Sequence, residues 1–278
     1  MRLGAPLFED CSTPEKWIAA LRKKGYSAAF CPVGSEAADD VVAAYEQAAR
    51  ENDIVVAEVG AWSSPICRDA PTAEDGRKRC VEGLRLADRI GANCCVNVSG
   101  SRGLPWYGHD PENLTPATFD LIVEFVQWLI EEVKPTRTCF TLETMEWMYP
   151  DSPDSYAQLV KAIDREHFAV HFDPTNLVCS PQLYYRTGEL ITEFVAKLGP
   201  QIKSCHAKDI SLSEKLTVHL DEVLPGTGNL DYATLLRQLE TLGPDVPLLI
   251  EHLSSEEQFD QAAAFIRGKA EEVGTEVV

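Results

Sequence analysis

Eight short apolar runs, separated by longer amphipathic stretches, follow one another along the whole chain and constrain its fold more than any other feature. This alternation is typical of repeated β-strand and α-helix units. Helix start and stop signals lie between the runs, such as Thr115-Pro116 before an amphipathic stretch and Gly91 after one. The predicted strands are Leu3–Leu7, Ala28–Pro32, Ile54–Val59, Cys94–Ser99, Cys139–Thr144, Phe168–Asp173, Ile202–Ala207 and Leu248–Leu253.

Two architectures alternate strands and helices in this way, the closed (β/α)8 TIM barrel and the doubly wound open sheet. The count of eight units and the absence of a glycine-rich phosphate loop after the first run favour the barrel. A length of 278 residues suits one barrel and leaves no room for a second full domain. No linker or low-complexity segment divides the chain, so we predict one barrel domain over residues 1–278.

Composition narrows the classes of function. The formal net charge of −19 repels a phosphate backbone, and no basic cluster offsets it, so we expect no nucleic-acid partner. No apolar run reaches the roughly 18 residues that a membrane span needs. Glu9 and Asp10 come before a signal-peptide apolar stretch could develop. Nine cysteines without a C-x-x-C pair suit a reducing compartment, so we expect a cytoplasmic protein.

Polar residues at the ends of the last four predicted strands break an otherwise apolar pattern. Strands packed between helices and a barrel core should be nearly all apolar. These four strands nevertheless carry, at or near their carboxyl ends, Glu143, Asp173, His206 and Glu251. Side chains alternate between the two faces of a strand, so the residue before each of them faces the helices and these four face the barrel axis. Barrel active sites lie at the carboxyl ends of the strands, so we expect the four side chains to meet there.

Three carboxylates and one imidazole form a donor set for a divalent metal ion. Such oxygen and nitrogen ligands suit Mn, Mg, Co, Zn or ferrous iron. Buried together without a cation, the three carboxylates would repel one another, so we predict one divalent ion per chain. The alternative is an internal layer of ion pairs in which Lys208 and His171 neutralise the acids.

The same four positions resemble the metal site of the xylose-isomerase-like superfamily. The similarity is sharpest over Val170–Asn176, Cys205–Asp209 and Leu224–Tyr232, the last resembling a P-G-x-G-x-x-D-[WY] element of sugar isomerases and epimerases. The superfamily also contains inosose dehydratases, hydroxypyruvate isomerases and apurinic endonucleases, so the resemblance implies a shared fold and metal site rather than one reaction. Asn176 stands where ketose 3-epimerases usually have a histidine, and six histidines are too few to place the three-metal set of the endonucleases.

The predicted chemistry is proton transfer at a carbon next to a carbonyl group, with a metal-stabilised enediolate. Glu143 and Glu251 could flank the substrate as base and acid, which suits a sugar or polyol isomerase or epimerase in carbohydrate metabolism. A lyase, either inosose dehydratase-like or cleaving C-glycosides by β-elimination, begins with the same proton abstraction. A non-catalytic carbohydrate-binding barrel is the third alternative, although binding alone would not require two opposed glutamates.

Further side chains are expected to contact a small-molecule sugar or polyol at the mouth of the barrel. They are Trp62, Asn97, His109, Glu146, Asn176 and Lys208. Structural alternatives exist: Trp62 could pack on the barrel rim, Asn97 could satisfy buried backbone groups, and Lys208 could pair with Asp209. His171 is expected to be a satisfied core histidine or a hydrogen-bond partner of the site. Analogy with the family suggests a homo-oligomer, and the sequence leaves open whether the sugar is phosphorylated.

Overall fold

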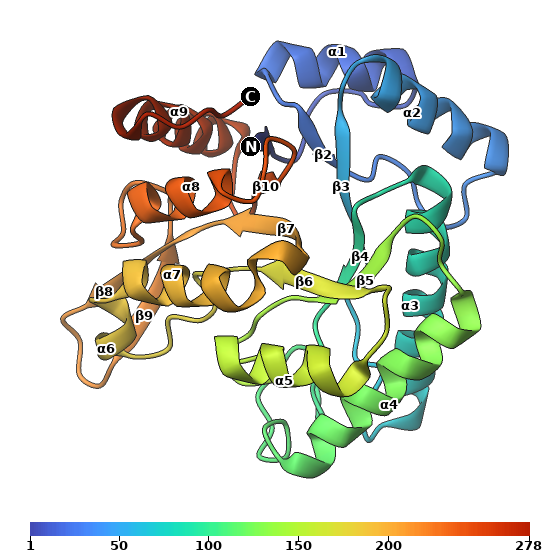
Figure 1. The fold of residues 1–278 in the computed structure, drawn as a ribbon, viewed down its shortest axis with the longest axis vertical. Helices are drawn as coiled ribbons and strands as arrows, with labels where there is room; N and C mark the ends of the chain where they lie inside the picture. Colours follow the sequence, from blue (N-terminus) through green and yellow to red (C-terminus); the bar gives the residue numbers. More distant parts are fainter.

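The computed structural model describes residues 1–278, and its main feature is a set of eight parallel strands with helices around them (Figure 1). Each strand overlaps one of the eight predicted runs. The strands are β1 (Arg2–Gly4), β2 (Ala28–Phe30), β3 (Val55–Gly60), β4 (Cys94–Asn97), β5 (Cys139–Leu142), β6 (Phe168–Phe172), β7 (Ile202–Ala207) and β10 (Pro247–Ile250).

The sheet curls into a nearly closed barrel. Its strand order is β1-β10-β7-β6-β5-β4-β3-β2, and every neighbouring pair in this order is parallel. The two ends of the sheet meet where the backbone N–H of Ser27 donates to the carbonyl of Leu3 at 3.1 Å. The prediction of a (β/α)8 TIM barrel is therefore confirmed.

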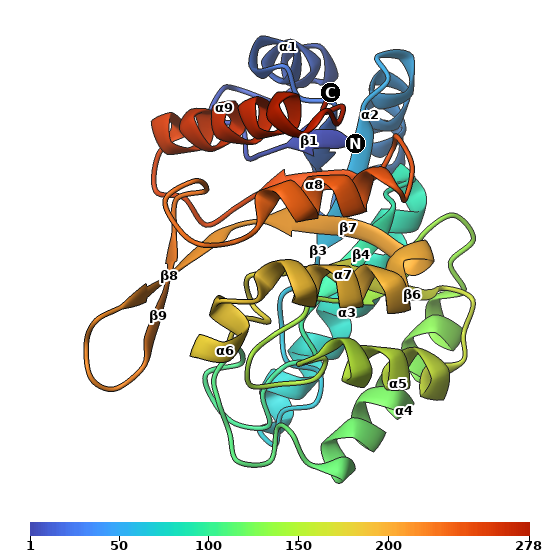
Figure 2. The same cartoon turned by 60° about the vertical axis from the view of Figure 1, so that its left-hand side comes forward.

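Helices connect consecutive strands and cover the outside of the barrel, as Figures 1 and 2 show from two directions. The helices are α1 (Pro14–Lys24), α2 (Asp39–Glu51), α3 (Ala70–Ile90), α4 (Pro116–Val133), α5 (Pro153–Ile163), α6 (Pro181–Tyr184), α7 (Thr187–Leu198), α8 (Tyr232–Glu240) and α9 (Glu256–Val273), with a 3-10 turn at Gly199–Gln201. None of them combines the length and the apolar character that crossing a membrane requires.

Local signals fix where these helices begin and end. The Thr115 side chain accepts a hydrogen bond from the Thr118 backbone N–H, and Pro116 occupies the first position of α4, where no N–H is needed. Gly91 ends α3 with a φ of 73°, a left-handed conformation that glycine adopts without strain. Between helices and sheet lies the apolar core, in which Phe172 of β6 stacks on Phe194 of α7 with ring centroids 4.0 Å apart.

A two-stranded antiparallel hairpin, β8 (Asp209–Ser213) with β9 (His219–Val223), follows β7 and was not predicted. It projects away from the barrel (Figure 2). The Asp209 carboxylate anchors its base, because it accepts the backbone N–H groups of Gly226, Gly228 and Leu230 at 2.9 to 3.0 Å. Asp209 therefore holds the glycine-rich segment that resembles a family element. Because these amides occupy the Asp209 carboxylate, Lys208 pairs with other acids.

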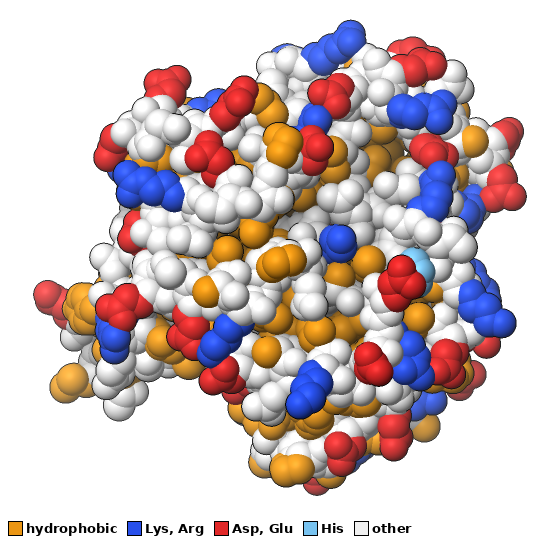
Figure 3. Space-filling model, viewed as in Figure 1, with side chains coloured by type: hydrophobic (Ala, Val, Ile, Leu, Met, Phe, Trp, Pro, Cys, Tyr) orange, Lys and Arg blue, Asp and Glu red, His pale blue; other side chains and the backbone are white.

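The surface carries the acidic excess without a basic patch on the face in view. Lysine and arginine side chains there are scattered among acidic and apolar ones (Figure 3). Many of the basic side chains pair with neighbouring acids, as Lys24 does with Glu256 and Asp260 at 2.7 Å.

Candidate metal centre

Four neighbouring strands deliver the four predicted ligands to one end of the barrel. Glu143, Asp173 and Glu251 come directly after β5, β6 and β10, and His206 is the penultimate residue of β7. The Nδ1 atom of His206 lies 3.0 Å from Glu143 Oε1, 2.9 Å from Glu251 Oε1 and 3.7 Å from Asp173 Oδ2. One donor atom from each of the four residues lies within 4.8 Å of the others, so the structure brings the four side chains together.

The centre is buried, and its charges depend on one another. The Asp173 and His206 side chains have no exposed surface. The Glu251 side chain is 13% exposed, so solvent reaches the centre from the side of Glu251. Burial acts to raise the pKa of Asp173, but Lys208 and His206 outweigh it and hold that pKa below its ordinary value. Burial acts to lower the pKa of His206, but Glu251, Glu58 and Glu143 raise it well above the ordinary value.

Lys208 adds an ammonium group to this centre. Its side chain is 1% exposed, and Nζ lies 2.5 Å from Glu251 Oε1, 2.8 Å from Asp173 Oδ2 and 3.6 Å from Glu143 Oε1. Lys208 thus pairs with the acids of the centre and not with Asp209. These carboxylates also hold the pKa of Lys208 well above its ordinary value against the effect of burial.

The donor set fits a divalent cation. With His206 in the neutral form that a metal ligand requires, three carboxylates against one ammonium group leave two negative charges, which a single dication balances. Asp173 Oδ2 and Glu251 Oε1 are buried and have no hydrogen bond of regular geometry, and Lys208 Nζ is an ion-pair partner of both, at 2.8 and 2.5 Å. Buried carboxylate oxygens without donors are unfavourable unless another partner binds them. Ion pairing with Lys208 therefore neutralises the acids only in part, and His171 does not take part in it.

Two further predicted residues border the centre. Asn176 Nδ2 donates to Glu143 Oε1 at 3.3 Å, and the backbone N–H groups of Thr175 and Asn176 donate to Asp173 Oδ1 at 2.9 and 3.1 Å. These bonds hold both carboxylates in place. Glu146 is partly buried with Oε2 unpaired, and burial, followed by the charge of Asp173, raises its pKa.

The sequence of this chain matches one protein family. Residues 15–269 match the model of the xylose isomerase-like TIM barrel family. The chain belongs to this family. No curated protein sequence matches the chain significantly.

Solved structures of similar fold share little sequence with this xylose isomerase-like barrel. A xylose isomerase-like TIM barrel protein from Mycobacterium smegmatis in complex with magnesium is 17% identical over 98% of this chain and 96% of that one, with a TM-score of 0.67. D-psicose 3-epimerase in the presence of D-fructose is 13% identical over 98% and 99%, with a TM-score of 0.68. The probable 3-DHS dehydratase AsbF from Bacillus anthracis is 12% identical over 96% and 97%, with a TM-score of 0.70. At these identities the likeness shows the fold.

The remaining predicted contact residues lie elsewhere. Asn97 is fully buried, but its Oδ1 accepts the backbone N–H of Ser63 at 2.9 Å and its Nδ2 contacts Cys80 Sγ at 3.3 Å. Its amide is thus used within the protein, which agrees with the structural alternative for Asn97. Trp62 is half-buried and packs over Gly60, where an added Cβ would lie 2.4 Å from the indole nitrogen. His109 is exposed on its loop, so neither residue is tied to the centre by a contact.

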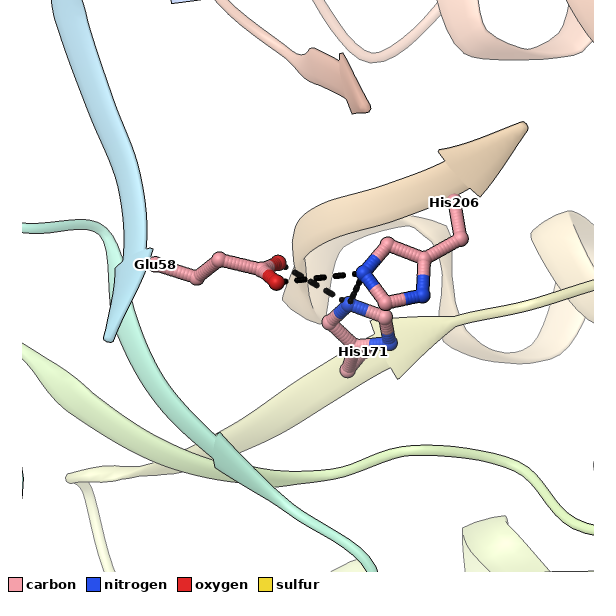
Figure 4. Close-up of side chains that lie close together, drawn as sticks. All are labelled: Glu58, His171 and His206. Atoms are coloured by element: carbon pink, nitrogen blue, oxygen red, sulfur yellow. Dashed lines mark hydrogen bonds and ion pairs between the residues drawn. The ribbon is translucent and has the colours of Figure 1, made fainter. Parts of the chain in front are cut away.

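Sequence reasoning missed Glu58, a buried glutamate of β3. Its side chain crosses the barrel toward two histidines (Figure 4), with Oε1 3.1 Å from His206 Nε2 and Oε2 3.1 Å from His171 Nε2. Ser204 Oγ donates to Oε2 at 2.7 Å. Burial acts to raise the pKa of Glu58, but His206 and His171 lower it below the ordinary value. The signal was a single polar residue within the apolar run Val55–Val59, similar to the polar residues that identified the four predicted ligands.

Proposed function

We propose that this chain is a divalent-metal-dependent isomerase or epimerase of sugars or polyols. The observation that carries the proposal is the convergence of Glu143, Asp173, His206 and Glu251 on one buried point, with two carboxylate oxygens that have no hydrogen bond of regular geometry. The epimerases among the similar structures support a carbohydrate substrate. A small molecule must approach from the side of Glu251, since the other three side chains are at most 7% exposed.

The four residues would hold the ion, and the chain's own groups would move the proton. When bound, the ion supplies Lewis acidity that polarises a substrate carbonyl group. Glu143 and Glu251 follow strands that are separated by β6 and β7, so they can face a substrate from two sides. One carboxylate takes the proton from the carbon next to the carbonyl, and the electron pair of that C–H bond passes into an enediolate. The other glutamate, in its protonated form, returns a proton to the opposite face of the carbon, which inverts it.

Neighbouring residues keep these groups in position. Two backbone N–H groups fix Asp173 through Oδ1, which leaves Oδ2 for the ion. Asn176 orients Glu143 through the bond to Oε1. The Lys208 ammonium group lies beside Glu251 and Asp173, where it can donate a hydrogen bond to a substrate oxygen that gains negative charge.

The second candidate function is a lyase of the same family, and the position of Lys208 favours it. A β-elimination needs a base for the proton and an acid for the departing oxygen. Lys208 Nζ is buried within 2.5 Å of Glu251 Oε1, so an acid and a base lie side by side at the same point. The structural likeness to a probable 3-DHS dehydratase is consistent with this reading.

The decisive experiment incubates metal-loaded protein with ketoses, inososes and 3-keto-glycosides in D2O and follows deuterium incorporation by NMR. Deuterium at one carbon without a change of mass other than the exchange identifies an isomerase or epimerase, whereas release of water or of an aglycone identifies a lyase. No exchange with any substrate class, together with no metal binding, would refute the proposal.

Four variants then test the division of labour. Glu143→Gln and Glu251→Gln keep an oxygen donor but lose the base, so we expect turnover to fall by about a hundredfold to ten-thousandfold with the metal largely retained. Asp173→Ala and His206→Ala should instead lose metal, and excess metal should restore part of the activity. Glu131→Gln, on the exposed side of α4, is the matched control for an acid-to-amide change. Rescue of the Gln variants by metal, but not of the Ala variants, would contradict the assignment.

A further inference from the structure

The barrel holds a second cluster of titratable side chains directly beside the proposed metal centre. It consists of Glu58, His171 and His206, all at most 1% exposed, with Ser204 as a fourth polar member. His206 belongs to both groups. Its Nδ1 atom faces the carboxylates of Glu143 and Glu251, and its Nε2 atom faces Glu58.

A histidine in this position must carry its proton on one particular nitrogen. To bind a cation through Nδ1, the imidazole needs a free electron pair there, so its proton has to sit on Nε2. A buried N–H group needs an acceptor. Glu58 Oε1, 3.1 Å from Nε2, is the acceptor that the structure offers.

Glu58 is itself held by other side chains. His171 Nε2 and Ser204 Oγ both lie within hydrogen-bonding distance of its second oxygen, at 3.1 and 2.7 Å. The two histidine Nε2 atoms lie 3.1 Å apart and both face the Glu58 carboxylate, and their rings meet edge to face at 74° (Figure 4). His171 Nδ1 has no partner, which agrees with a ring whose proton is on Nε2 and donated to Glu58.

We propose that Glu58 is a positioning residue for the metal centre: it accepts the Nε2 proton of His206 and thereby fixes the tautomer and ring orientation that let Nδ1 bind the ion. His171 and Ser204 hold the Glu58 carboxylate for this task. The inference rests on the metal site proposed above. Where a carboxylate accepts the N–H of a metal-binding histidine, replacing that carboxylate typically weakens metal binding by about ten- to a hundredfold.

The rival arrangement is a second ion bound by Glu58, His171 and His206, with His206 bridging two metals. One donor atom from each of the three residues lies within 4.8 Å of the others, which is a suitable spacing for an ion. The hydrogen-bonded arrangement is favoured because Ser204 already donates to Glu58 and because a bridging imidazole would have to lose both protons. Metal stoichiometry separates the two.

The test measures Mn²⁺ binding by titration calorimetry for the wild-type chain, Glu58→Gln and Glu131→Gln. Glu131→Gln is the matched control, because it makes the same acid-to-amide change on the exposed side of α4, away from the centre. We expect one ion per chain in all three proteins, with the dissociation constant raised about ten- to a hundredfold in Glu58→Gln and less than about threefold in Glu131→Gln. Equal affinity in wild type and Glu58→Gln would overturn the inference, as would two ions per wild-type chain and one in Glu58→Gln.

A measurement on the wild-type chain keeps the inference testable if Glu58→Gln does not fold. With ¹⁵N-labelled histidine and Zn²⁺, long-range ¹H–¹⁵N spectra report which ring nitrogen of His206 carries hydrogen. The expected signature is a protonated Nε2 and a metal-bound Nδ1, and coordination through Nε2 would overturn the inference. Failure of the wild-type chain to bind any divalent ion would instead refute the metal site itself.

Discussion

Lys208→Met tests the electrostatic reasoning about the candidate centre most directly. In the metal-free protein this change removes the only ammonium group near three carboxylates while keeping an unbranched side chain of similar length. Removing one partner of a buried ion pair typically costs about 3–5 kcal/mol, because the remaining charge stays buried without compensation. With Lys208 1% exposed, solvent does not reduce this cost. In urea, such a loss should lower the unfolding midpoint by about 1 to 2 M.

Bound metal should reverse the effect of Lys208→Met, from unfavourable in the metal-free protein to favourable for binding. A dication next to an ammonium group is repelled by it, so Lys208→Met should bind Mn²⁺ at least about tenfold more tightly than the wild type. The assay is urea unfolding with EDTA and with saturating Mn²⁺, combined with calorimetry. Lys203→Met, near the start of the same strand β7, is the control and should change neither quantity. If Lys208→Met is as stable as the wild type in EDTA and binds Mn²⁺ with unchanged affinity, the charge balance inferred for the centre is wrong.

Two further predictions concern the surroundings of the centre. The raised pKa of Glu146 means that the folded state loses stability as pH rises from the unfolded value of the carboxyl, about 4.3, through the higher folded pKa. Glu146→Gln should therefore gain stability relative to wild type as pH rises above about 4.3. Urea midpoints at a series of pH values check it, and a pH-independent difference would contradict it. Asp209→Ala removes the acceptor of the amides at Gly226, Gly228 and Leu230, so we expect a loss of about 1.5–3 kcal/mol and faster hydrogen exchange over residues 226–230. Unchanged exchange there would show that Asp209 does not hold the loop.

The fold was predictable because its signal is local and repeated. Each of the eight apolar runs is long enough for one strand, and most of the helices between them begin at a Ser, Thr or Asp whose side chain accepts a backbone N–H. The hairpin β8–β9 was not predicted because it lacks such a local signal. Most residues of β9 (His219–Val223) are exposed and polar, so no apolar pattern marks the strand.

The four converging side chains could be predicted because side-chain alternation needs only the strand and its end. Asn97 shows the limit of that reasoning, since its position at the end of β4 was correct but its amide bonds to Ser63 and Cys80. Which partner a polar group takes depends on loops that fold over it, and a strand pattern does not contain that information. The same holds for Lys208, whose sequence neighbour Asp209 binds a loop while Lys208 turns inward to the acids.

Glu58 and Asp173 differ in how completely their carboxylate oxygens are hydrogen-bonded. Both are buried acids that face the barrel interior, but each Glu58 oxygen has a hydrogen-bond donor, whereas Asp173 Oδ2 has only the ion pair with Lys208 at 2.8 Å. A carboxylate whose hydrogen bonds are complete stabilises its neighbours and gains nothing from a ligand. A buried carboxylate whose hydrogen bonds are incomplete is stabilised when a cation binds to it. Glu58, whose hydrogen bonds are complete, therefore supports His206, whereas the carboxylates of the candidate metal centre are the ones that can bind an ion. His206 belongs to both groups.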